Sequence, residues 1–458
     1  MALLRMQKSI RRALPLLLAL LLLLSACGET AASEPTPVPS LTPSPAPTPV
    51  PTPEPTPVPT PEPTPVPPAE QVELDSELRS YIKADLLDGN YLTDRLFAAG
   101  ASLSFTAEVP FCSMYVVFGS YPGEWTLLAG AREYACGQNG FLHEYIALDE
   151  PVKTVTLVLG KSKTMVADVY AFSEGPAPDW VQVWEAPDSP ADLLIFTPHS
   201  DDELLFLGGM IPYYASVRGL QVQVVYMTTN YEPASTYLSH YSGSYRYRPH
   251  ESLNGLWECG VRRYPVTNMV PDLALENLWY AQARYGKDSF AAFQTEQIRR
   301  FKPLVVATLA EDGEYGHSVH ILTALSVERA VEAAADPEQF PASAERWGLW
   351  DTPKTYLHRY GEDEEMTILN YEEPSEALGG RTPFRTAQDA YALHLTQQQW
   401  NDFFVYDYGH RYDSHRHGLF RSLVGPDAEK NDLMENVSRE AFPAVSTQGA
   451  REEPAAET

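Results

Sequence analysis

The chain has 458 residues, a length that by itself suggests about three domains. It carries 61 acidic residues against 33 basic ones, a formal net charge of −28, which argues against nucleic acid as a partner. We interpret this charge as a solvated surface that keeps an exported protein dispersed, and it carries little information about a substrate.

Residues 1–26 have the pattern of an export signal. Four basic residues precede the apolar run Ala13–Leu24, and the sequence Leu24-Ser25-Ala26-Cys27 follows directly. This resembles a bacterial lipoprotein signal with its lipobox. The resemblance implies cleavage before Cys27, a diacylglyceryl group on its sulfur, and an extracytoplasmic protein anchored to a bacterial membrane. A retained transmembrane helix is disfavoured, because a span needs roughly 20 apolar residues.

Residues 27–70 form a proline-rich linker. Residues 28–70 hold 17 of the 40 prolines, and the octad Pro-Thr-Pro-Glu-Pro-Thr-Pro-Val occurs twice in tandem. Alternating prolines favour polyproline II, so residues 35–68 would extend roughly 100 Å at about 3.1 Å per residue. Recognition of the tract by a partner is an alternative, but a spacer fits its place directly behind a lipid anchor.

Residues 71–180 predict an all-β sandwich domain. Short alternating segments lie between turn residues, and they are Ser102–Val109, Ser113–Phe118, Trp125–Leu128, Thr154–Leu159 and Val166–Phe172. The opening Leu87–Asp94, the Trp125 segment and the closing strand resemble a galactose-binding-like module. That resemblance implies either a sugar-binding domain or a purely structural one, and the structural domain is the simpler interpretation.

The four cysteines are Cys27, Cys112, Cys136 and Cys259. An oxidising compartment would allow a bridge between Cys112 and Cys136, although connectivity does not follow from sequence alone. Cys259 ends an apolar helical pattern, which favours a small buried residue over a nucleophile.

Residues 186–437 predict an α/β domain. Strands are expected at Leu193–Thr197, Val222–Met227 and Leu304–Thr308, and helical runs at Leu204–Ser216, Glu251–Cys259, Phe290–Phe301 and Ile321–Ala335. The strands are apolar on both faces, as a Rossmann-like parallel sheet with helices on both faces requires. No Gly-x-Gly-x-x-Gly follows the first strand, which disfavours a nucleotide-binding version of the fold.

The C-terminal part of this domain mixes several patterns. A strand is expected at Thr355–Arg359 and a helix at Thr386–Asn401. Three histidines follow among arginines, and these residues are His410, His415, His417, Arg411, Arg416 and Arg421. Because the guanidinium groups would repel a cation, a surface or substrate-lining loop is favoured here over a metal site. Residues 438–458 are acidic and alanine-rich, and we expect a disordered tail.

Two of the predicted strands end in histidine and carboxylate side chains. The first is followed by Pro198-His199-Ser200-Asp201-Asp202-Glu203, and the third leads into Gly316-His317-Ser318-Val319-His320. The carboxyl ends of parallel strands meet at one edge of a sheet, where α/β proteins bind ligands. A catalytic zinc site needs three protein ligands that leave a fourth position for water. An acidic pair at a helix N-terminus could be purely structural, but that would not explain the histidines.

At these residues the chain resembles the PIG-L/LmbE-like de-N-acetylases, zinc hydrolases that act on N-acetylglucosamine-containing substrates. The family pattern Pro-His-x-Asp-Asp-Glu matches residues 198–203, and Gly-His-x-x-His matches residues 316–320. An intermediate Arg-x-x-Glu feature matches Arg248–Glu251, with Gly260-Val261 after it. The resemblance covers roughly residues 190–360.

The resemblance implies a role for each matched residue. His199, Asp202 and His320 would bind Zn²⁺, and Asp201 would be the base that takes a proton from the zinc-bound water. An ionised carboxylate within hydrogen-bond reach suits that task, because zinc lowers the pKa of its water toward about 7.

Two further residues are implied to act on the substrate. His317 would protonate the leaving amine and stabilise the oxyanion, and Arg248 would position a sugar hydroxyl or a phosphate. The usual form of the second motif is His-Pro-Asp-His, so the carboxylate expected to orient His317 is missing here. Glu314 or Asp312 could replace it from the preceding loop.

The sequence therefore predicts a membrane-anchored zinc hydrolase that removes an N-acetyl group from an N-acetylglucosamine-type sugar or glycan. Two alternatives remain at this stage. One is a surface glycan-binding lipoprotein with an inactive hydrolase domain, and the other is a zinc amidase acting on a non-sugar amide or a thiol conjugate.

Overall fold

The computed structural model describes residues 66–229, 247–271, 277–398 and 403–444. These residues all fall within one compact unit. The predicted signal peptide, Cys27 and nearly all of the proline-rich linker lie outside the described residues.

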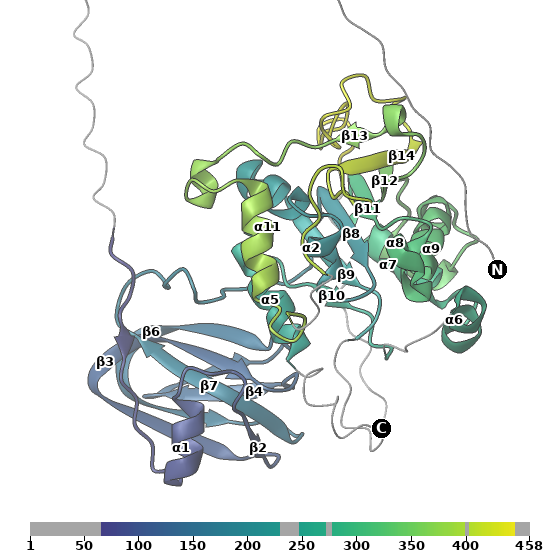
Figure 1. The fold of residues 1–458 in the computed structure, drawn as a ribbon. Coiled ribbons are helices and arrows are strands. Elements are labelled where there is room, and N and C mark those ends of the chain that lie inside the picture. The colour runs from purple at the N-terminus through teal and green to yellow at the C-terminus, as the bar shows by residue number, and fades with distance from the viewer. Residues whose placement is uncertain (1–65, 230–246, 272–276, 399–402, 445–458) are drawn as a thin grey trace, which may run out of the picture. The chain divides into compact units, whose positions relative to one another are not determined.

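The N-terminal part of the described chain is an antiparallel sheet (Figure 1). Its strands follow the order β1-β7-β3-β6-β4-β5, and β2 pairs with β7. One short helix, α1 (Ser80–Leu86), joins the first two strands. The strands are β1 (Gln71–Val72), β2 (Arg95–Phe97), β3 (Ser102–Phe118), β4 (Trp125–Ala129), β5 (Arg132–Cys136), β6 (His143–Val158) and β7 (Thr164–Phe172).

Two expected strands, Ser102–Val109 and Ser113–Phe118, are halves of the single long strand β3. Irregular pairing with β6 between Thr106 and Ser113 marks the point where the two halves meet. The second half also pairs with β7, so the strands form one continuous hydrogen-bonded sheet. A division into two packed layers, as in a sandwich, stays a prediction.

The second sheet is mixed, whereas a purely parallel sheet was expected. Its order is β10-β9-β8-β11-β12-β14-β13, with parallel pairing from β10 to β12 and antiparallel pairing of β14 with β12 and of β13 with β14. Of the two extra strands, β13 has only two residues and β14 is rich in polar residues, so their sequence resembles a loop. The strands are β8 (Leu193–Thr197), β9 (Val222–Tyr226), β10 (Val266–Thr267), β11 (Val305–Thr308), β12 (Lys354–His358), β13 (Thr367–Ile368) and β14 (Arg416–Ser422).

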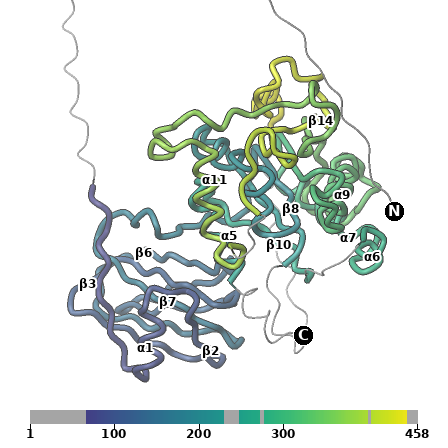
Figure 2. The backbone as a smooth tube through the Cα atoms, in the orientation of Figure 1, coloured from purple at the N-terminus to yellow at the C-terminus, as the bar shows by residue number. Residues whose placement is uncertain are grey.

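Helices cover both faces of this sheet, as expected. Figure 1 shows α7 (Ser289–Phe301) and α9 (Ser318–Ala335) on one side, and α5 (Arg248–Glu258) and α11 (Pro383–Ala392) on the other. Alternate residues of β8 enter two different hydrophobic clusters, which explains why its first four positions are all apolar. In Figure 2, α11 lies beside α5 although the two are far apart in sequence.

The remaining helical segments are short. They are α2 (Asp202–Leu205), α3 (Met210–Pro212), the π-helical turn η1 (Tyr213–Val217), α6 (Leu278–Tyr285), α8 (Gly313–Gly316), α10 (Pro341–Trp347), and the 3₁₀ turns η2 (Asp363–Glu365) and η3 (Glu376–Leu378).

Two expected helices differ from the structure. The run Leu204–Ser216 is broken at Gly208, whose φ of 48° interrupts the helix. The helix expected at Thr386–Asn401 begins earlier, at Pro383, and ends at Ala392. Threonine at its N-cap and proline in its first turn favour that start.

Three smaller expectations concern the cysteines and the tail. Cys112, Cys136 and Cys259 are all free in the structure, and Cys259 is buried as expected. Residues 438–444, which we had expected to be disordered, are held to the domain: Arg439 donates to Asp192 Oδ1 at 2.9 Å. The rest of the tail lies outside the described residues.

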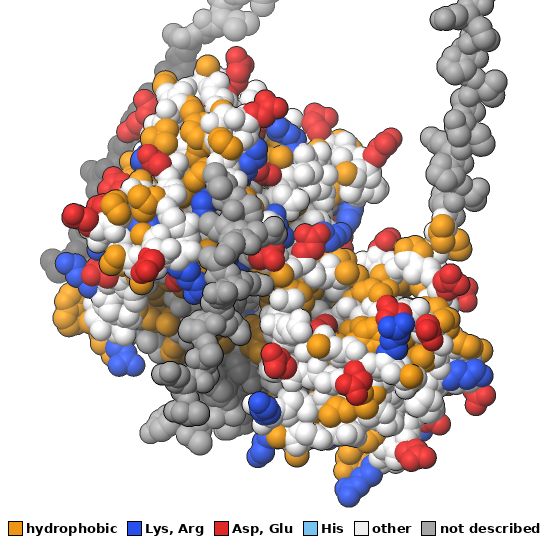
Figure 3. Space-filling view, turned by 180° about the vertical axis from the view of Figure 1, so that it is seen from behind, with side chains coloured by type: hydrophobic (Ala, Val, Ile, Leu, Met, Phe, Trp, Pro, Cys, Tyr) orange, Lys and Arg blue, Asp and Glu red, His pale blue; other side chains and the backbone are white. Residues whose placement is uncertain are grey.

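Charged side chains are mixed on the surface. On the face drawn in Figure 3, Lys and Arg alternate with Asp and Glu among scattered apolar side chains. Among the described helices, none combines the length and the apolar character that crossing a bilayer demands.

Candidate active site

The loop after β8 brings the first motif into the interior. Residues from His199 to Glu203 are all buried, and Asp201 adopts a φ of 147°, which a residue with a side chain rarely does. Glu203 holds this conformation by accepting the backbone N–H of Asp201 at 2.9 Å. Glu203 also accepts the hydroxyl of Tyr226 at 2.7 Å, which fixes the carboxylate against β9.

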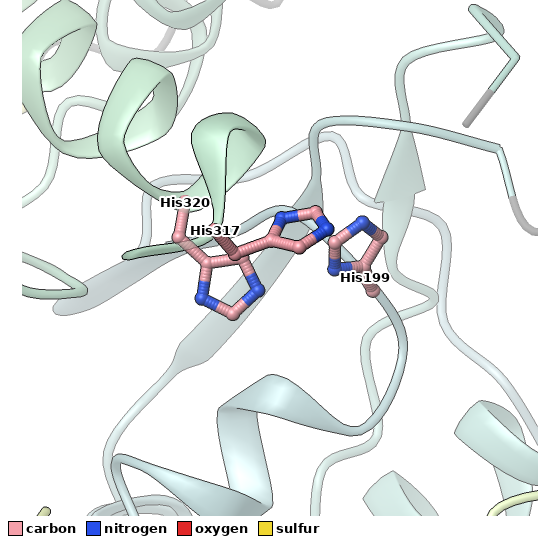
Figure 4. Close-up of side chains that lie close together, drawn as sticks. All are labelled: His199, His317 and His320. Atoms are coloured by element: carbon pink, nitrogen blue, oxygen red, sulfur yellow. The ribbon is translucent and has the colours of Figure 1, made fainter. Parts of the chain in front are cut away.

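The second motif lies at the start of α9. His317 caps this helix and His320 stands in its first turn. Figure 4 shows the rings of both residues turned toward His199, which comes from the loop after β8. The ring centroid of His199 lies 5.1 Å from that of His317 and 5.3 Å from that of His320. One nitrogen from each of the three rings lies within 4.8 Å of the others.

Asp202 lies between two of these rings. Its Oδ2 is 2.9 Å from His199 Nδ1 and 3.3 Å from His320 Nε2. Burial acts to raise the pKa of Asp202, but His320 and His199 outweigh burial and hold the pKa below its ordinary value. The three side chains therefore present one carboxylate oxygen and two imidazole nitrogens to the same point.

This donor set fits Zn²⁺, which binds imidazole and carboxylate groups from three protein ligands in catalytic sites. His320 Nε2 is buried and makes no hydrogen bond of good geometry with any of the described residues. A buried polar atom without such a bond is costly in an ordinary interior, and it is what a metal ligand requires. His317 Nδ1 is also buried, but the His317 side chain is partly exposed, as a group that reaches a substrate would be.

A buried carboxylate orients His320 from behind. Glu314 Oε2 lies 3.0 Å from His320 Nδ1, and Glu314 Oε1 lies 3.1 Å from His358 Nδ1. Oε1 also accepts the backbone N–H of Ala310 at 2.8 Å, and His358 Nε2 lies 3.0 Å from the carbonyl oxygen of Asp413. Histidine ligands of zinc commonly hold a carboxylate on their second nitrogen in this way.

The two carboxylates considered as partners of His317 contact other groups. Glu314 contacts His320 and His358, and Asp312 accepts the backbone N–H of Glu314 at 3.0 Å. The replacement suggested for His317 from the sequence therefore stays a prediction.

Arg248 lies against the predicted base. Its Nη2 donates to Asp201 Oδ1 at 2.8 Å and to the carbonyl oxygen of Ser200 at 2.9 Å. Burial raises the pKa of Asp201 to about 7, with a further contribution from the charge of Asp202, while Arg248 acts in the opposite direction. Arg248 was predicted to hold a substrate; in the structure it also fixes the position of Asp201.

Sequence reasoning missed three histidine and tyrosine residues near this site. His358 ends β12, the next parallel strand, so the rule that located His199 could have found it. The ring of Tyr315 meets that of His320 edge to face, with centroids 5.3 Å apart. His394 follows α11 and is fully buried; burial, with Arg248 nearby, lowers its pKa to about 3. In the sequence, only the apolar helical pattern that precedes His394 could have indicated its position.

The α/β part of the chain matches the model of a known enzyme family. Residues 194–331 match the family model PIG-L, described as GlcNAc-PI de-N-acetylase, and this range contains every residue placed above at the candidate metal site. The resemblance stated from the motifs is thereby confirmed: the α/β part of the chain is a PIG-L/LmbE-like domain.

Two curated relatives have similar sequences. One is 1D-myo-inositol 2-acetamido-2-deoxy-alpha-D-glucopyranoside deacetylase 1 of Catenulispora acidiphila, 29% identical over 42% of this chain and 61% of that protein. The other is the deacetylase of the same substrate from Streptomyces scabiei, 30% identical over 43% of this chain and 64% of that protein. The chain thus spans about three fifths of these relatives.

A solved structure that part of the chain matches is the N,N'-diacetylchitobiose deacetylase from Pyrococcus horikoshii. The match has a TM-score of 0.33 at 19% identity and covers 46% of this chain and 70% of that one.

Proposed function

We propose that this protein is a zinc-dependent hydrolase that removes the N-acetyl group from an N-acetylglucosamine-type sugar. The observation that carries the proposal is the position of Asp202 Oδ2 between the nitrogens of His199 and His320, with Asp201 and Arg248 beside it. The family match and the deacetylase relatives support the same reaction.

Each residue has a definite task in this reaction. Zinc held by His199, Asp202 and His320 would supply a water of lowered pKa and polarise the amide carbonyl. Asp201 accepts a proton from the attacking water, and Arg248 holds the carboxylate in place for this step. His317 donates a proton to the amine nitrogen as the C–N bond breaks, so that acetate and a free amino sugar leave.

We further propose that the mature protein is extracytoplasmic and held to a bacterial membrane by a lipid on Cys27. The lipoprotein-like signal and the proline-rich spacer behind it support this location. We propose the antiparallel sheet domain as an accessory module of galactose-binding-like type, with sugar binding or a structural role as its two alternatives.

Acetate release from a panel of N-acetylated amino sugars tests the function. We expect the zinc-loaded protein to release acetate, and Asp201→Asn to keep its zinc while the rate falls by about 10²- to 10⁴-fold, as loss of a general base does. Full activity in Asp201→Asn would overturn the assignment of the base. Sugar binding without acetate release would favour the inactive glycan-binding alternative, and release only from non-sugar amides would favour the other.

A further inference from the structure

The histidine-rich segment 408–417, which runs from the loop before β14 into the first residues of that strand, is not used by the proposed reaction. Its three histidines do not converge on one point. His410 stacks on Tyr406 with ring centroids 4.5 Å apart, and His417 Nε2 lies 3.1 Å from the carbonyl oxygen of Ser414. Only His415 faces other potential ligands.

His415 is held rigidly and is fully buried. Its Nδ1 lies 2.9 Å from Asp413 Oδ1, which leaves Nε2 as the second nitrogen. The ring lies between the rings of Tyr408 and Phe384, with centroid distances of 3.6 and 5.4 Å and interplanar angles of 20° and 29°. The direction of Nε2 is therefore fixed by packing and by a carboxylate.

That nitrogen is buried, and among the described residues it has no hydrogen-bond partner. It faces two carboxylates, Asp407 in the same loop and Glu372 in the segment after β13. Glu372 Oε1 lies 3.7 Å away, and ligand atoms of Glu372, Asp407 and His415 all lie within 4.8 Å of one another. An imidazole with a carboxylate on its other nitrogen is the common arrangement of a metal-binding histidine.

The local charge favours a cation, in contrast to what the sequence suggested. Arg416 is paired with Asp413 at 3.0 Å, and Arg421 with Asp351 at 2.6 Å. The guanidinium of Arg411 lies over the ring of Tyr412, 4.2 Å from its centroid. The arginines that were expected to repel a metal are therefore engaged elsewhere, and two carboxylates remain to neutralise a divalent ion.

We propose that Glu372, Asp407 and His415 bind a divalent transition-metal ion such as Zn²⁺, at a second site distinct from that of His199, Asp202 and His320. Ligand distances of about 2.0 to 2.2 Å require the ligand atoms to approach more closely than they do here. Both carboxylates are exposed and can rotate, while the buried imidazole stays fixed.

A metal at this site would join the loop before β14 to the segment after β13. The same loop carries the Asp413 carbonyl, to which His358 bonds, and His358 in turn contacts Glu314, the carboxylate that orients His320. The second ion would therefore stabilise a loop that supports the candidate active site, without touching the substrate.

The zinc content of the full chain, measured after equilibration with Zn²⁺ and removal of excess metal, tests the proposal. We expect about two equivalents in the unaltered protein and about one in His199→Ala, since each three-ligand site holds one ion. Glu372→Gln combined with Asp407→Asn should also hold one, and all three substitutions together none. Glu373→Gln, which changes an exposed neighbouring carboxylate, is the matched control and should hold two.

Thermal unfolding gives a second readout that does not depend on the first site. Zn²⁺ should raise the melting temperature of His199→Ala by several degrees and leave that of the triple variant unchanged. A folded His199→Ala that retains no zinc would overturn the proposal. So would a double variant, Glu372→Gln with Asp407→Asn, that keeps as much zinc as the unaltered protein.

Discussion

Glu314 contacts two histidines that the fold brings together from α9 and β12. It is buried, and it contacts His320 through one oxygen and His358 through the other. Burial acts to raise the pKa of Glu314, but its hydrogen bonds to His320 and His358 outweigh burial and keep the pKa below its ordinary value. Glu314 is therefore a charged acceptor, which makes His320 a stronger ligand through its other nitrogen.

We expect Glu314→Gln to weaken zinc binding at the candidate active site by about 10- to 100-fold, the usual effect of removing a carboxylate behind a histidine ligand. Competition with a chelator of known affinity measures this change. Glu332→Gln, which alters an exposed carboxylate on the same helix as His320, is the control and should leave the affinity unchanged. Equal zinc affinity in Glu314→Gln and the unaltered protein would contradict the orienting role.

Asp168 in β7 is a buried carboxyl group whose ionisation should make the stability depend on pH. Burial raises its pKa to about 7, although Tyr170 and Gly89 donate hydrogen bonds to it. The pKa of Asp168 is higher in the folded state than in the unfolded state. The protonated carboxyl group therefore contributes its full stability below about pH 4, and this contribution is lost as the pH rises toward 7. Asparagine cannot ionise, so Asp168→Asn should not lose stability in this way. We expect the variant to be more stable than the unaltered protein at pH 7.5 by on the order of 2 kcal/mol.

Chemical denaturation at pH 4.5 and pH 7.5 measures the effect. The difference in unfolding free energy between Asp168→Asn and the unaltered protein should grow from the lower to the higher pH. Asp179→Asn, at an exposed position, is the control and should show no such trend. A pH-independent difference for Asp168→Asn would rule out the titration as its cause.

At the scale of single elements, the break after α2 is enforced by Gly208. Its φ is 48°, and a Cβ at this position would lie 2.3 Å from the hydroxyl oxygen of Ser414. Gly219 has a similar φ of 63°, but nothing lies within 4 Å of a Cβ there. Comparing alanine substitutions at Gly208 and Gly219 therefore separates the free-energy cost of the backbone conformation from that of the steric clash.

We expect Gly208→Ala to lower the free energy of unfolding by about 2 to 4 kcal/mol, the sum of a conformational and an overpacking cost. Gly219→Ala should lower it by only about 1 kcal/mol, because its cost is conformational alone. Urea titrations at constant pH compare the two. Equal losses would mean that the contact with Ser414 relaxes freely.

The elements that sequence analysis located are those with an unambiguous pattern. The range of β8 is as predicted, and β9 and β11 differ by one residue, because strands buried on both faces are uninterrupted apolar runs. Strands β13 and β14 were missed because β13 has only two residues and β14 is rich in polar residues, so neither is an apolar run. The candidate metal-site residues were proposed from motifs, whereas the bond from Glu314 to His320 depends on a turn whose path the sequence does not specify.

At the scale of the whole molecule, the proposed lipid anchor at Cys27 and the compact folded unit lie in different parts of the chain. A diacylglyceryl group contributes about 0.8 kcal/mol per buried CH₂ group, so two acyl chains hold a protein at a membrane firmly. The compact unit begins at Pro65, well after Cys27, so we expect its fold to be independent of the proposed anchor. Membrane attachment and acetate release should therefore be separable by a single substitution.

We expect Cys27→Ser to move the protein, expressed in a bacterial host, from the detergent phase to the aqueous phase in a Triton X-114 partition, because serine cannot carry the thioether-linked lipid. Its rate of acetate release in solution should be unchanged. Cys112→Ser is the control and should stay in the detergent phase. If Cys27→Ser also stays there, the apolar run Ala13–Leu24 is itself the anchor, and the lipid proposal fails.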